Sequence, residues 1–403
     1  MDEVITKDGR TLAVEQWGVP TGTPVIYLHG SPMSRLARHP DDSLFERLGI
    51  RLITYDRPGF GCSTPLPGRQ VVDAAEDVAA VADHLGLDRF AVFGVSGGGP
   101  HALAFAARHP GRVTRVGALA SLAPRDAAGL DWTAGMNEGN TRSATVAVTD
   151  REAVLAHLSA VGTAGLPPLP EVERAVLSRP EIGAMLGPAF AEAVRPGLDG
   201  WVDDVRALFG TPWGFDPAEV SVPVRLWHGG LDTLVPPAHA EWLAARMPTA
   251  DLTLQQDAGH GGHFDATPAM LAWLVGFPGL DTEELLAGRS VTVHVAGRDL
   301  HVQLGAPTAV DALPRLRALL ADFASVRERA TEYLWDWDAN GGEGERERAD
   351  FLAALTPTTL VVTGDGTVEL HYEEIDEKYL MDGYWPAVHL DRGLVPVEVT
   401  IES

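Results

Sequence analysis

Unbroken apolar runs alternate with amphipathic segments along the first 280 residues of the chain. After a short hairpin around Asp8–Gly9, the runs PVIYLHG and RLITYDRPGFG predict central strands covered on both faces. Further strands are predicted at FAVF (90–93), RVTRVGALASLAP and VPVRLWHGGLD. Residues 69–86 carry apolar side chains at three- and four-residue steps, which predicts a helix with one buried stripe. A strand over 250–260 and a helix over 267–277 follow further on. Strands alternating with helices indicate an α/β fold with a mostly parallel sheet.

One long stretch interrupts this alternation. Residues 123–220 are helical in tendency, broken by prolines and rich in large aromatic side chains, so we interpret them as an insertion. The α/β core is then built from residues 1–122 and 221–280. The aromatic residues of the insertion either line a pocket for an apolar group or hold the insertion together.

The pattern changes again at about residue 285. A strictly alternating hairpin around Gly297–Arg298, an amphipathic helix over 313–337 and four strand-like runs predict an α+β domain, 285–403, with its own core. His294 and His301 are expected to face each other across the hairpin, either as the start of a metal site or as an exposed polar pair. No third ligand is evident, so no metal is expected. A protein-binding or regulatory role is our hypothesis for this domain.

Composition and charge narrow the possible functions. The chain has 403 residues, 45% of them hydrophobic and 22% charged, as in globular proteins of about two domains. Its formal net charge of −25 argues against nucleic acid or an anionic membrane as partner. The first ten residues carry charges throughout, so no secretory signal is expected. The sequence has no long apolar run, so no transmembrane helix is expected. A single cysteine, Cys62, cannot form an intrachain disulfide, so we expect a cytoplasmic protein.

Polar motifs follow the predicted strands, where parallel sheets usually carry their active sites. They lie at His29, Tyr55–Asp56, Ser96, Asp232 and His260. Because all of these positions come directly after a strand, we expect their side chains to meet at one edge of the sheet. The sequence therefore predicts an enzyme active site for a small-molecule substrate, with no cofactor.

Ser96 is the candidate nucleophile. It occupies the centre of the G-x-S-x-G pattern Gly94–Gly98, between a strand and a helix, which is the setting of a sharp turn that exposes the hydroxyl. Gly94 and Gly98 are expected to be glycine because a side chain would collide in so tight a turn. A serine hydroxyl needs a neighbouring base, and histidine has the suitable pKa.

His260 in DAGHGGH is the predicted base, and His263 is its rival, for which a solvated loop histidine is the plainer reading. Asp232 in HGGLDTLVP is the predicted acid that orients His260, the alternative being a helix-capping aspartate. Asp257 lies too close to His260 in sequence to reach the right ring nitrogen.

Two backbone N–H groups are expected to bind the negatively charged oxygen of the intermediate. One belongs to Gly97, directly behind the nucleophile, and the other to Ser31 in the loop LHGSP. His29 and Gly30 are expected to support that loop. Cys62 is expected to pack in its own loop.

The five motifs LHGSP, YDRPGFGCS, GVSGGG, HGGLDTLVP and DAGHGGH, in this order, resemble the α/β-hydrolase superfamily over about residues 1–280. The resemblance implies an eight-stranded sheet with a helical cap inserted after the sixth strand. Within the family the chain is similar to bacterial proline iminopeptidases and small esterases. It departs from the peptidase pattern in the oxyanion loop, His29–Met33, and at Gly97. Serine rather than aspartate at position 96 argues against haloalkane dehalogenase or epoxide hydrolase chemistry.

These observations predict a serine hydrolase that cleaves a small ester, or less readily an amide, through an acyl-enzyme. A catalytically silent binding protein on the same fold is one alternative, and a carbon–carbon bond hydrolase or perhydrolase is another. Glu138 in the insertion either binds a substrate amine or is a solvated loop residue. The C-terminal domain is the part for which a protein partner is expected.

Overall fold

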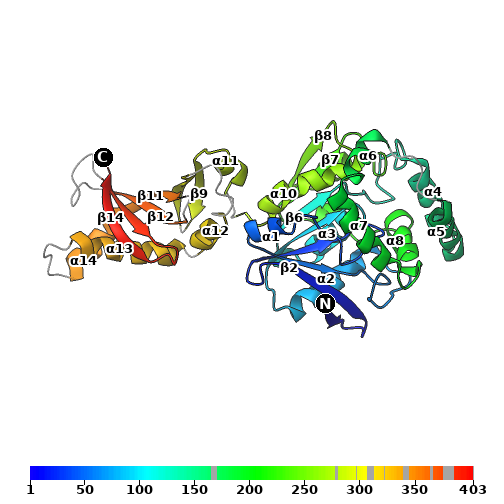
Figure 1. The fold of residues 1–403 in the computed structure, drawn as a ribbon, viewed down its shortest axis with the longest axis horizontal. Helices are drawn as coiled ribbons and strands as arrows, with labels where there is room; N and C mark the ends of the chain where they lie inside the picture. Colours follow the sequence, from blue (N-terminus) through cyan, green and yellow to red (C-terminus); the bar gives the residue numbers. More distant parts are fainter. Residues whose placement is uncertain are drawn as a thin grey trace. The chain divides into compact units, whose positions relative to one another are not determined.

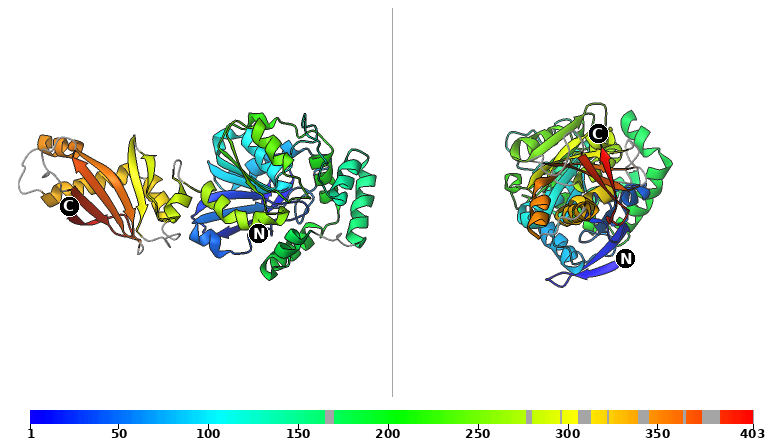
Figure 2. Two further views of the ribbon diagram at one scale, coloured as in Figure 1. Left: turned by 90° about the horizontal axis from the view of Figure 1, so that it is seen from above. Right: turned by 90° about the vertical axis from the view of Figure 1, so that its left-hand side faces the viewer.

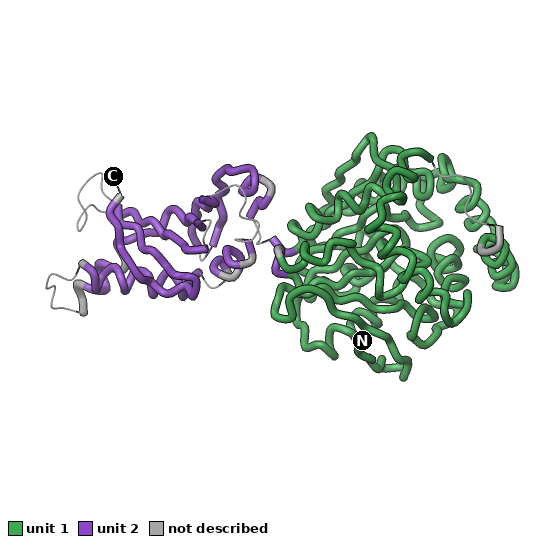
Figure 3. Tube along the Cα trace, in the orientation of Figure 1, with its two compact units in different colours: residues 1–46, 50–274 green, residues 47–49, 275–403 purple. Residues whose placement is uncertain are grey.

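The chain divides into two compact units, residues 1–46 with 50–274 and residues 47–49 with 275–403 (Figure 3). The computed structural model describes residues 1–164, 170–276, 280–295, 297–305, 313–321, 323–338, 345–363, 366–374 and 385–402. Each unit has its own hydrophobic cluster. Leu280 is buried in the cluster of the second unit, so the first unit ends earlier than the predicted boundary at residue 280.

An eight-stranded sheet forms the centre of the first unit, in the order β1-β2-β4-β3-β5-β6-β7-β8. Its strands are β1 Asp2–Ile5, β2 Thr11–Gly18, β3 Thr23–Leu28, β4 Ile50–Tyr55, β5 Phe90–Val95, β6 Val113–Leu119, β7 Val224–Gly229 and β8 Ala250–Gln255. The pairs β1–β2 and β2–β4 are antiparallel, and every pair from β4 to β8 is parallel. All six residues of β5 are buried, as expected of an apolar run covered on both faces. The predicted mostly parallel sheet is confirmed.

Helices cover both faces of this sheet (Figure 1). They are α1 Ser43–Arg47, α2 Ala74–His84, α3 Gly98–Arg108, α9 Ala238–Arg246 and α10 His263–Leu274, with short 3-10 turns at η1 Val71–Asp73, η2 Pro110–Arg112, η3 Pro217–Glu219 and η4 His260–Gly262. Apolar residues of α2, α3 and α9 share one cluster with the sheet, and α10 packs against β5, β6 and β7. Helix α10 begins at His263 rather than at residue 267, because η4 leads directly into it.

The insertion between β6 and β7 is helical, as its sequence predicts. It contains α4 Glu138–Ala147, α5 Arg151–Ala164, α6 Glu171–Leu177, α7 Pro180–Ala193 and α8 Asp199–Phe209, which we call the cap. These helices gather on one side of the first unit (Figures 1 and 2). Among the described residues, no helix is long and apolar enough to cross a membrane.

The second unit is an α+β domain with a six-stranded sheet in the order β14-β13-β12-β11-β10-β9. Its elements are α11 Thr282–Leu286, β9 Val291–Val295, β10 Arg298–Leu304, α12 Leu313–Ala321, α13 Phe323–Asp338, α14 Glu345–Ala354, β11 Leu355–Val362, β12 Val368–Glu374, β13 Trp385–Leu390 and β14 Pro396–Glu402. Only the pair β10–β11 is parallel among the described strand pairs of this sheet. The helix predicted over 313–337 corresponds to α12 and α13, and residue 322 between them lies outside the described residues.

The prediction that His294 and His301 face each other across the hairpin is wrong. Because Val295 pairs with Arg298, the register places His294 opposite Asp299 and His301 opposite Thr292. The His294 and Asp299 side chains are 2.9 Å apart, and the His301 Nδ1 atom lies 3.0 Å from the Thr292 hydroxyl. The two imidazoles therefore have separate partners and do not form the beginning of a metal site.

Candidate active site

Ser96 occupies a strained turn between β5 and α3. Its φ of 54° lies in the left-handed region, which is unusual for a residue with a side chain, and its N–H donates to the Leu119 carbonyl at 2.8 Å. A Cβ atom on Gly94 would overlap the Gly98 carbonyl, and one on Gly98 would overlap the Leu28 carbonyl. The glycines predicted on steric grounds are thus required where helix α3 starts against the sheet.

Asp232 and His260 come together from the loops after β7 and β8. The Nδ1 atom of His260 is 2.7 Å from Oδ2 of Asp232, whose side chain is fully buried. The other carboxylate oxygen, Oδ1, accepts the N–H groups of Leu234 at 2.8 Å and Val235 at 2.9 Å. The carboxylate is therefore held by the turn that follows β7 and oriented toward the imidazole. Asp257, the neighbour in sequence, is exposed.

Burial and charge act in opposite directions on this pair. Burial alone raises the pKa of Asp232, but the facing His260 and His228 outweigh it and hold that pKa well below its usual range. Burial lowers the pKa of His260, yet the charge and hydrogen bond of Asp232, helped by Glu173, raise it above the ordinary histidine value. Asp232 is thus ionised at neutral pH, and it stabilises the protonated imidazole that general-base catalysis would form.

His263 is not a solvated loop residue in this structure. It is the first residue of α10, half-buried, with its ring centroid 6.1 Å from that of His260. Burial, together with the charge on His260, lowers its pKa to about 3. The expectation of a solvated histidine was wrong because α10 starts earlier and draws this side chain into the cavity wall.

Ser96 and His260 line the same cavity, which has a volume of about 360 Å³. Most of its wall is apolar and comes from the sheet, from α10 and from the cap, with Phe93, Leu122, Met185, Trp201, Phe209 and Phe264 among the lining residues. The hydrogen bonds of the described residues do not include one from the Ser96 hydroxyl to the His260 imidazole. Such catalytic contacts often tighten only when a substrate is bound.

The loop after β3 faces the nucleophile. Ser31 and Gly97 both line the cavity, and a Cβ atom added to Gly97 would lie 3.1 Å from the Ser31 Cβ. Within the described part of the chain, neither backbone N–H has a hydrogen-bond partner. Both N–H groups are therefore available to an oxygen in the cavity. Gly30 also lines the cavity, but a Cβ there would make only ordinary contacts, so sterics do not require glycine at that position.

His29 supports this loop from the inside. It is buried, its Nδ1 atom lies 2.8 Å from the Gly30 carbonyl oxygen, and the Arg57 N–H points at its Nε2 atom at 3.3 Å. Burial and the nearby Arg57 hold the pKa of His29 well below its usual value, so the ring is neutral. As expected, His29 does not line the cavity.

A buried charge cluster behind the loop was missed by the sequence analysis. Arg57 donates to the backbone carbonyls of His29 and Gly30 and pairs with Asp204 of cap helix α8. Arg69 also pairs with Asp204, at 2.7 Å. Burial alone raises the pKa of Asp204, but the two guanidinium groups hold it well below its usual range. The motif YDRPGFG marks the position of Arg57, whereas no sequence pattern distinguishes Asp204.

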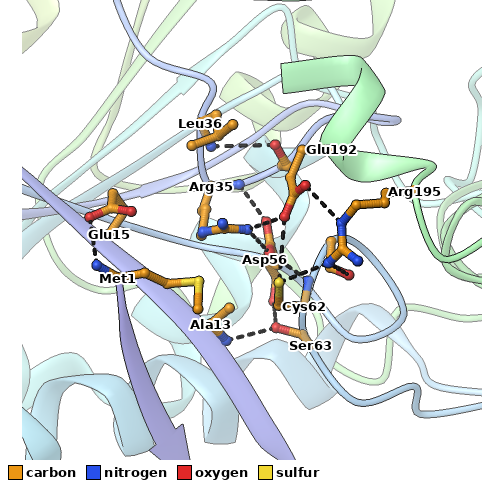
Figure 4. A network of polar contacts seen from close by, with 12 residues as sticks. Met1, Ala13, Glu15, Arg35, Leu36, Asp56, Cys62, Ser63, Glu192 and Arg195 are labelled. Carbon is orange, nitrogen blue, oxygen red and sulfur yellow. Dashed lines mark hydrogen bonds and ion pairs between the residues drawn. The ribbon is translucent and has the colours of Figure 1, made fainter. Parts of the chain in front are cut away.

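A second polar cluster joins the first strands to cap helix α7 (Figure 4). The Asp56 carboxylate accepts the N–H of Cys62 at 3.0 Å and a guanidinium N–H of Arg35, which also binds Glu192. Arg195 binds Glu192 at 2.9 Å and contacts the exposed Cys62 sulfur at 2.8 Å. Asp56, Cys62 and Glu192 lie close enough for a metal ion, but arginines and backbone N–H groups already bind the two carboxylates.

The cap contributes a different acid to the cavity from the one predicted. Glu138 begins α4 and is exposed, and it does not line the cavity, as the solvated alternative expected. Glu173 of α6 does line it and is 2% exposed. The aromatic residues divide between the two expected roles: Trp201 lines the cavity, whereas Trp132 and Trp213 are buried in the core cluster.

Comparison with known proteins agrees with this architecture. The sequence profile of the family described as alpha/beta hydrolase fold matches residues 23–145. The first unit of the chain has the α/β-hydrolase fold. It is 28% identical over 274 residues to a non-heme haloperoxidase of Rhodococcus erythropolis, covering 65% of this chain and 93% of that protein.

Two further similarities extend this picture of an α/β hydrolase. A bifunctional esterase/perhydrolase of Acinetobacter calcoaceticus is 35% identical over 126 residues, which are 31% of this chain and 45% of that protein. The structure of a hydrolase from Pseudomonas aeruginosa matches with a TM-score of 0.51 and 22% identity, covering 68% of this chain and 96% of that one. The last likeness shows the fold. The comparisons thus agree with an enzyme of the α/β-hydrolase fold, and they do not identify the bond that it cleaves.

Proposed function

We propose that this α/β hydrolase cleaves small carboxylic esters with an apolar acyl or alcohol group through an acyl-enzyme on Ser96. One observation carries the proposal. Ser96 and His260 line one largely apolar cavity, and the far ring nitrogen of His260 is bound by the buried Asp232 at 2.7 Å. A small apolar cavity with few polar groups suits a neutral ester better than a charged substrate.

In the proposed reaction, His260 takes the proton of the Ser96 hydroxyl as its oxygen attacks the ester carbonyl. The carbonyl oxygen becomes negative and is bound by the free N–H groups of Ser31 and Gly97. His260 then gives its proton to the departing alcohol. Water, activated by the same imidazole, hydrolyses the acyl-enzyme and frees Ser96. Asp232 keeps the imidazole oriented in both half-reactions.

A panel of p-nitrophenyl esters of graded acyl length, beside amino-acid anilides, tests the substrate class. We expect turnover of short and medium acyl esters, and little of the anilides, since the exposed Glu138 does not line the cavity. Ser96→Ala is expected to lower kcat by about four to six orders of magnitude and to leave the fold intact. Stoichiometric labelling by a fluorophosphonate should disappear with the same substitution. A protein that is folded but neither labelled nor active would favour the binding-protein alternative.

The similarity to an esterase/perhydrolase supports a second candidate reaction at the same residues. In that reaction hydrogen peroxide replaces water, so that the acyl-enzyme yields a peracid and free serine. Peracid formation from a short carboxylate and hydrogen peroxide, measured beside ester hydrolysis, separates the two candidates. An ester hydrolase of the first kind would give ester turnover without peracid.

A further inference from the structure

Glu173 brings a negative charge from the cap to the loop that carries His260. It lies in α6, is 2% exposed, and helix α6 contacts the short turn η4 that begins at His260. A carboxylate so deeply buried needs strong partners, because an unpaired charge is strongly disfavoured away from water. The described ion pairs give Glu173 no arginine or lysine. Its partners are backbone N–H groups instead.

Both oxygens of the carboxylate are bound to consecutive backbone N–H groups. Oε1 accepts the N–H of His260, and Oε2 accepts the N–H of Gly261 at 2.8 Å. The glycines on either side allow this approach: a Cβ on Gly259 would overlap Oε1, and one on Gly261 would lie 3.0 Å from Oε2. Glu173 thus holds the main chain of His260 while Asp232 holds its ring.

We propose that Glu173 is a positioning residue for His260, through which the cap takes part in assembling the catalytic site. This inference rests on the proposed function, because it assigns Glu173 to the base of that reaction. The Asp232 hydrogen bond fixes one ring nitrogen, but the ring can still move as a whole if its backbone moves. Two N–H···O bonds to one carboxylate remove that freedom. Misplacing a catalytic group by about 1 Å can cost on the order of a hundredfold in rate.

The charge of Glu173 has a second, measurable effect. Burial lowers the pKa of His260, and Asp232 and Glu173 raise it. The other titratable groups around the ring are His263 on α10, at 6.1 Å between ring centroids, and His228 on β7, which contacts Asp232 at 3.3 Å. Of these, Glu173 alone comes from the cap. Removing its charge should therefore shift the titration of His260 to lower pH.

The experiment compares Glu173→Gln with Glu171→Gln in the full chain. Both remove one negative charge from the same helix, but Glu171 is exposed. Glutamine has the size of glutamate, yet its NH2 group cannot accept the second N–H. The readouts are kcat and KM on a p-nitrophenyl ester from pH 5 to 9, and the NMR titration of the His260 ring.

At pH values above the His260 titration, we expect Glu173→Gln to lower kcat about 10- to 100-fold. The acid limb of kcat/KM should move to lower pH, and the NMR titration of the His260 ring should shift in the same direction. Glu171→Gln should leave all three readouts unchanged. Equal pH profiles and kcat values within twofold for the two variants would overturn the proposal. A change confined to the KM of amine-bearing substrates would also overturn it, in favour of an amine-binding group.

Two further measurements keep the test decisive. If Glu173→Gln does not fold, Glu173→Asp replaces it in the test, because aspartate keeps the charge on a shorter side chain. Glu173→Asp should lower kcat while the acid limb of kcat/KM stays near its wild-type position. An unchanged kcat would refute the positioning role of Glu173. If the wild-type protein hydrolyses no ester, the proposed function fails. The NMR titration of His260 in the two glutamine variants still decides whether Glu173 acts on this ring.

Discussion

Asp232 and Asp257 have the same side chain and both precede His260 in the chain, but their surroundings differ completely. Asp232 is buried, receives two backbone N–H groups on one oxygen and faces the His260 ring with the other. Asp257 is exposed to solvent, where a carboxylate is strongly screened. The burial and hydrogen bonds of its carboxylate therefore distinguish Asp232 from Asp257 as the candidate acid.

This difference predicts opposite results for two matched substitutions. Asp232→Asn should lower kcat about 10⁴-fold, because the amide can no longer hold the imidazole in the productive tautomer. Asp257→Asn should leave kcat within about twofold, as expected of an exposed side chain. Steady-state kinetics of both variants on one p-nitrophenyl ester make the comparison. Exchanged outcomes would show that the acid has been misassigned.

The pH dependence of the reaction should report on His260. The general base must be neutral to accept a proton, so kcat/KM should fall on the acid side as the imidazole becomes protonated. Because Asp232 and Glu173 raise the pKa of His260, the midpoint of this limb should lie above the ordinary histidine value of about 6.5. A kcat/KM profile measured in buffers of constant ionic strength tests this. A midpoint below that value would mean that burial outweighs the two acids.

At the scale of elements, the site depends on close contact between helix α3, the loops and the cap. The turn around Ser96 fits only because backbone atoms of β3, β5 and α3 approach one another without side chains between them. Cap helix α8 reaches the loop after β3 through Asp204 and Arg57. Both contacts join segments that are far apart in sequence.

The turn makes a steric prediction. Gly98→Ala should destabilise the protein strongly, because its Cβ would overlap the Leu28 carbonyl of the neighbouring strand. Gly111→Ala is the matched control, since nothing lies within 4 Å of a Cβ at that position. Thermal unfolding of the two variants is the measurement. Equal melting temperatures would contradict the tight approach described for this turn.

The charge cluster makes an energetic prediction. Asp204→Asn leaves Arg57 and Arg69 buried without their carboxylate, which should cost about 3–5 kcal/mol of unfolding free energy. Asp199→Asn, on the same helix, removes a solvent-exposed partner of Arg151 and should cost less than about 1 kcal/mol. Urea unfolding of both variants measures the difference.

The same cluster has a definite pH dependence. The folded pKa of Asp204 lies below its unfolded value, so its stabilising contribution is present above about pH 4 and is lost as the pH falls toward the folded pKa. The stability gap between wild type and Asp204→Asn should therefore narrow in acid. A gap that widened there would contradict the assignment of an ionised Asp204.

At the scale of the whole molecule, each of the two units has its own large hydrophobic cluster. All residues that line the cavity lie within 27–267, in the first unit. The second unit buries its own set, including Phe351, Leu320 and Tyr372. Its role as a binding partner for another protein stays a prediction.

Phe351→Ala tests this division. It should destabilise the second unit by about 3–5 kcal/mol through the cavity that it creates, while kcat/KM on esters stays unchanged below the unfolding transition. Trp337→Ala is the control, because that side chain is half exposed on α13. Calorimetry and ester kinetics on the same samples supply both readouts. Loss of activity in step with stability would mean that the two units unfold together.

The sequence by itself determined the order of strands and helices in the first unit, the helical insertion after β6 and the elbow at Ser96. These features depend on local rules: apolar runs form covered strands, three- and four-residue periodicity forms helices, and glycines flank a sharp turn. The sequence also predicted Asp232 and His260 as site residues, because in a parallel sheet the carboxyl ends of the strands meet at one edge.

Only the tertiary structure decided which distant groups support these residues. Glu173 and Asp204 have no local pattern that separates them from the other acids of this strongly acidic chain, and the register of β9 and β10 moved His294 and His301 to other partners. Burial changes the free energy of a charge by several kcal/mol, and burial is set by packing between elements. Local sequence patterns do not specify which elements pack together, so the partners of a buried charge are known only from the tertiary structure.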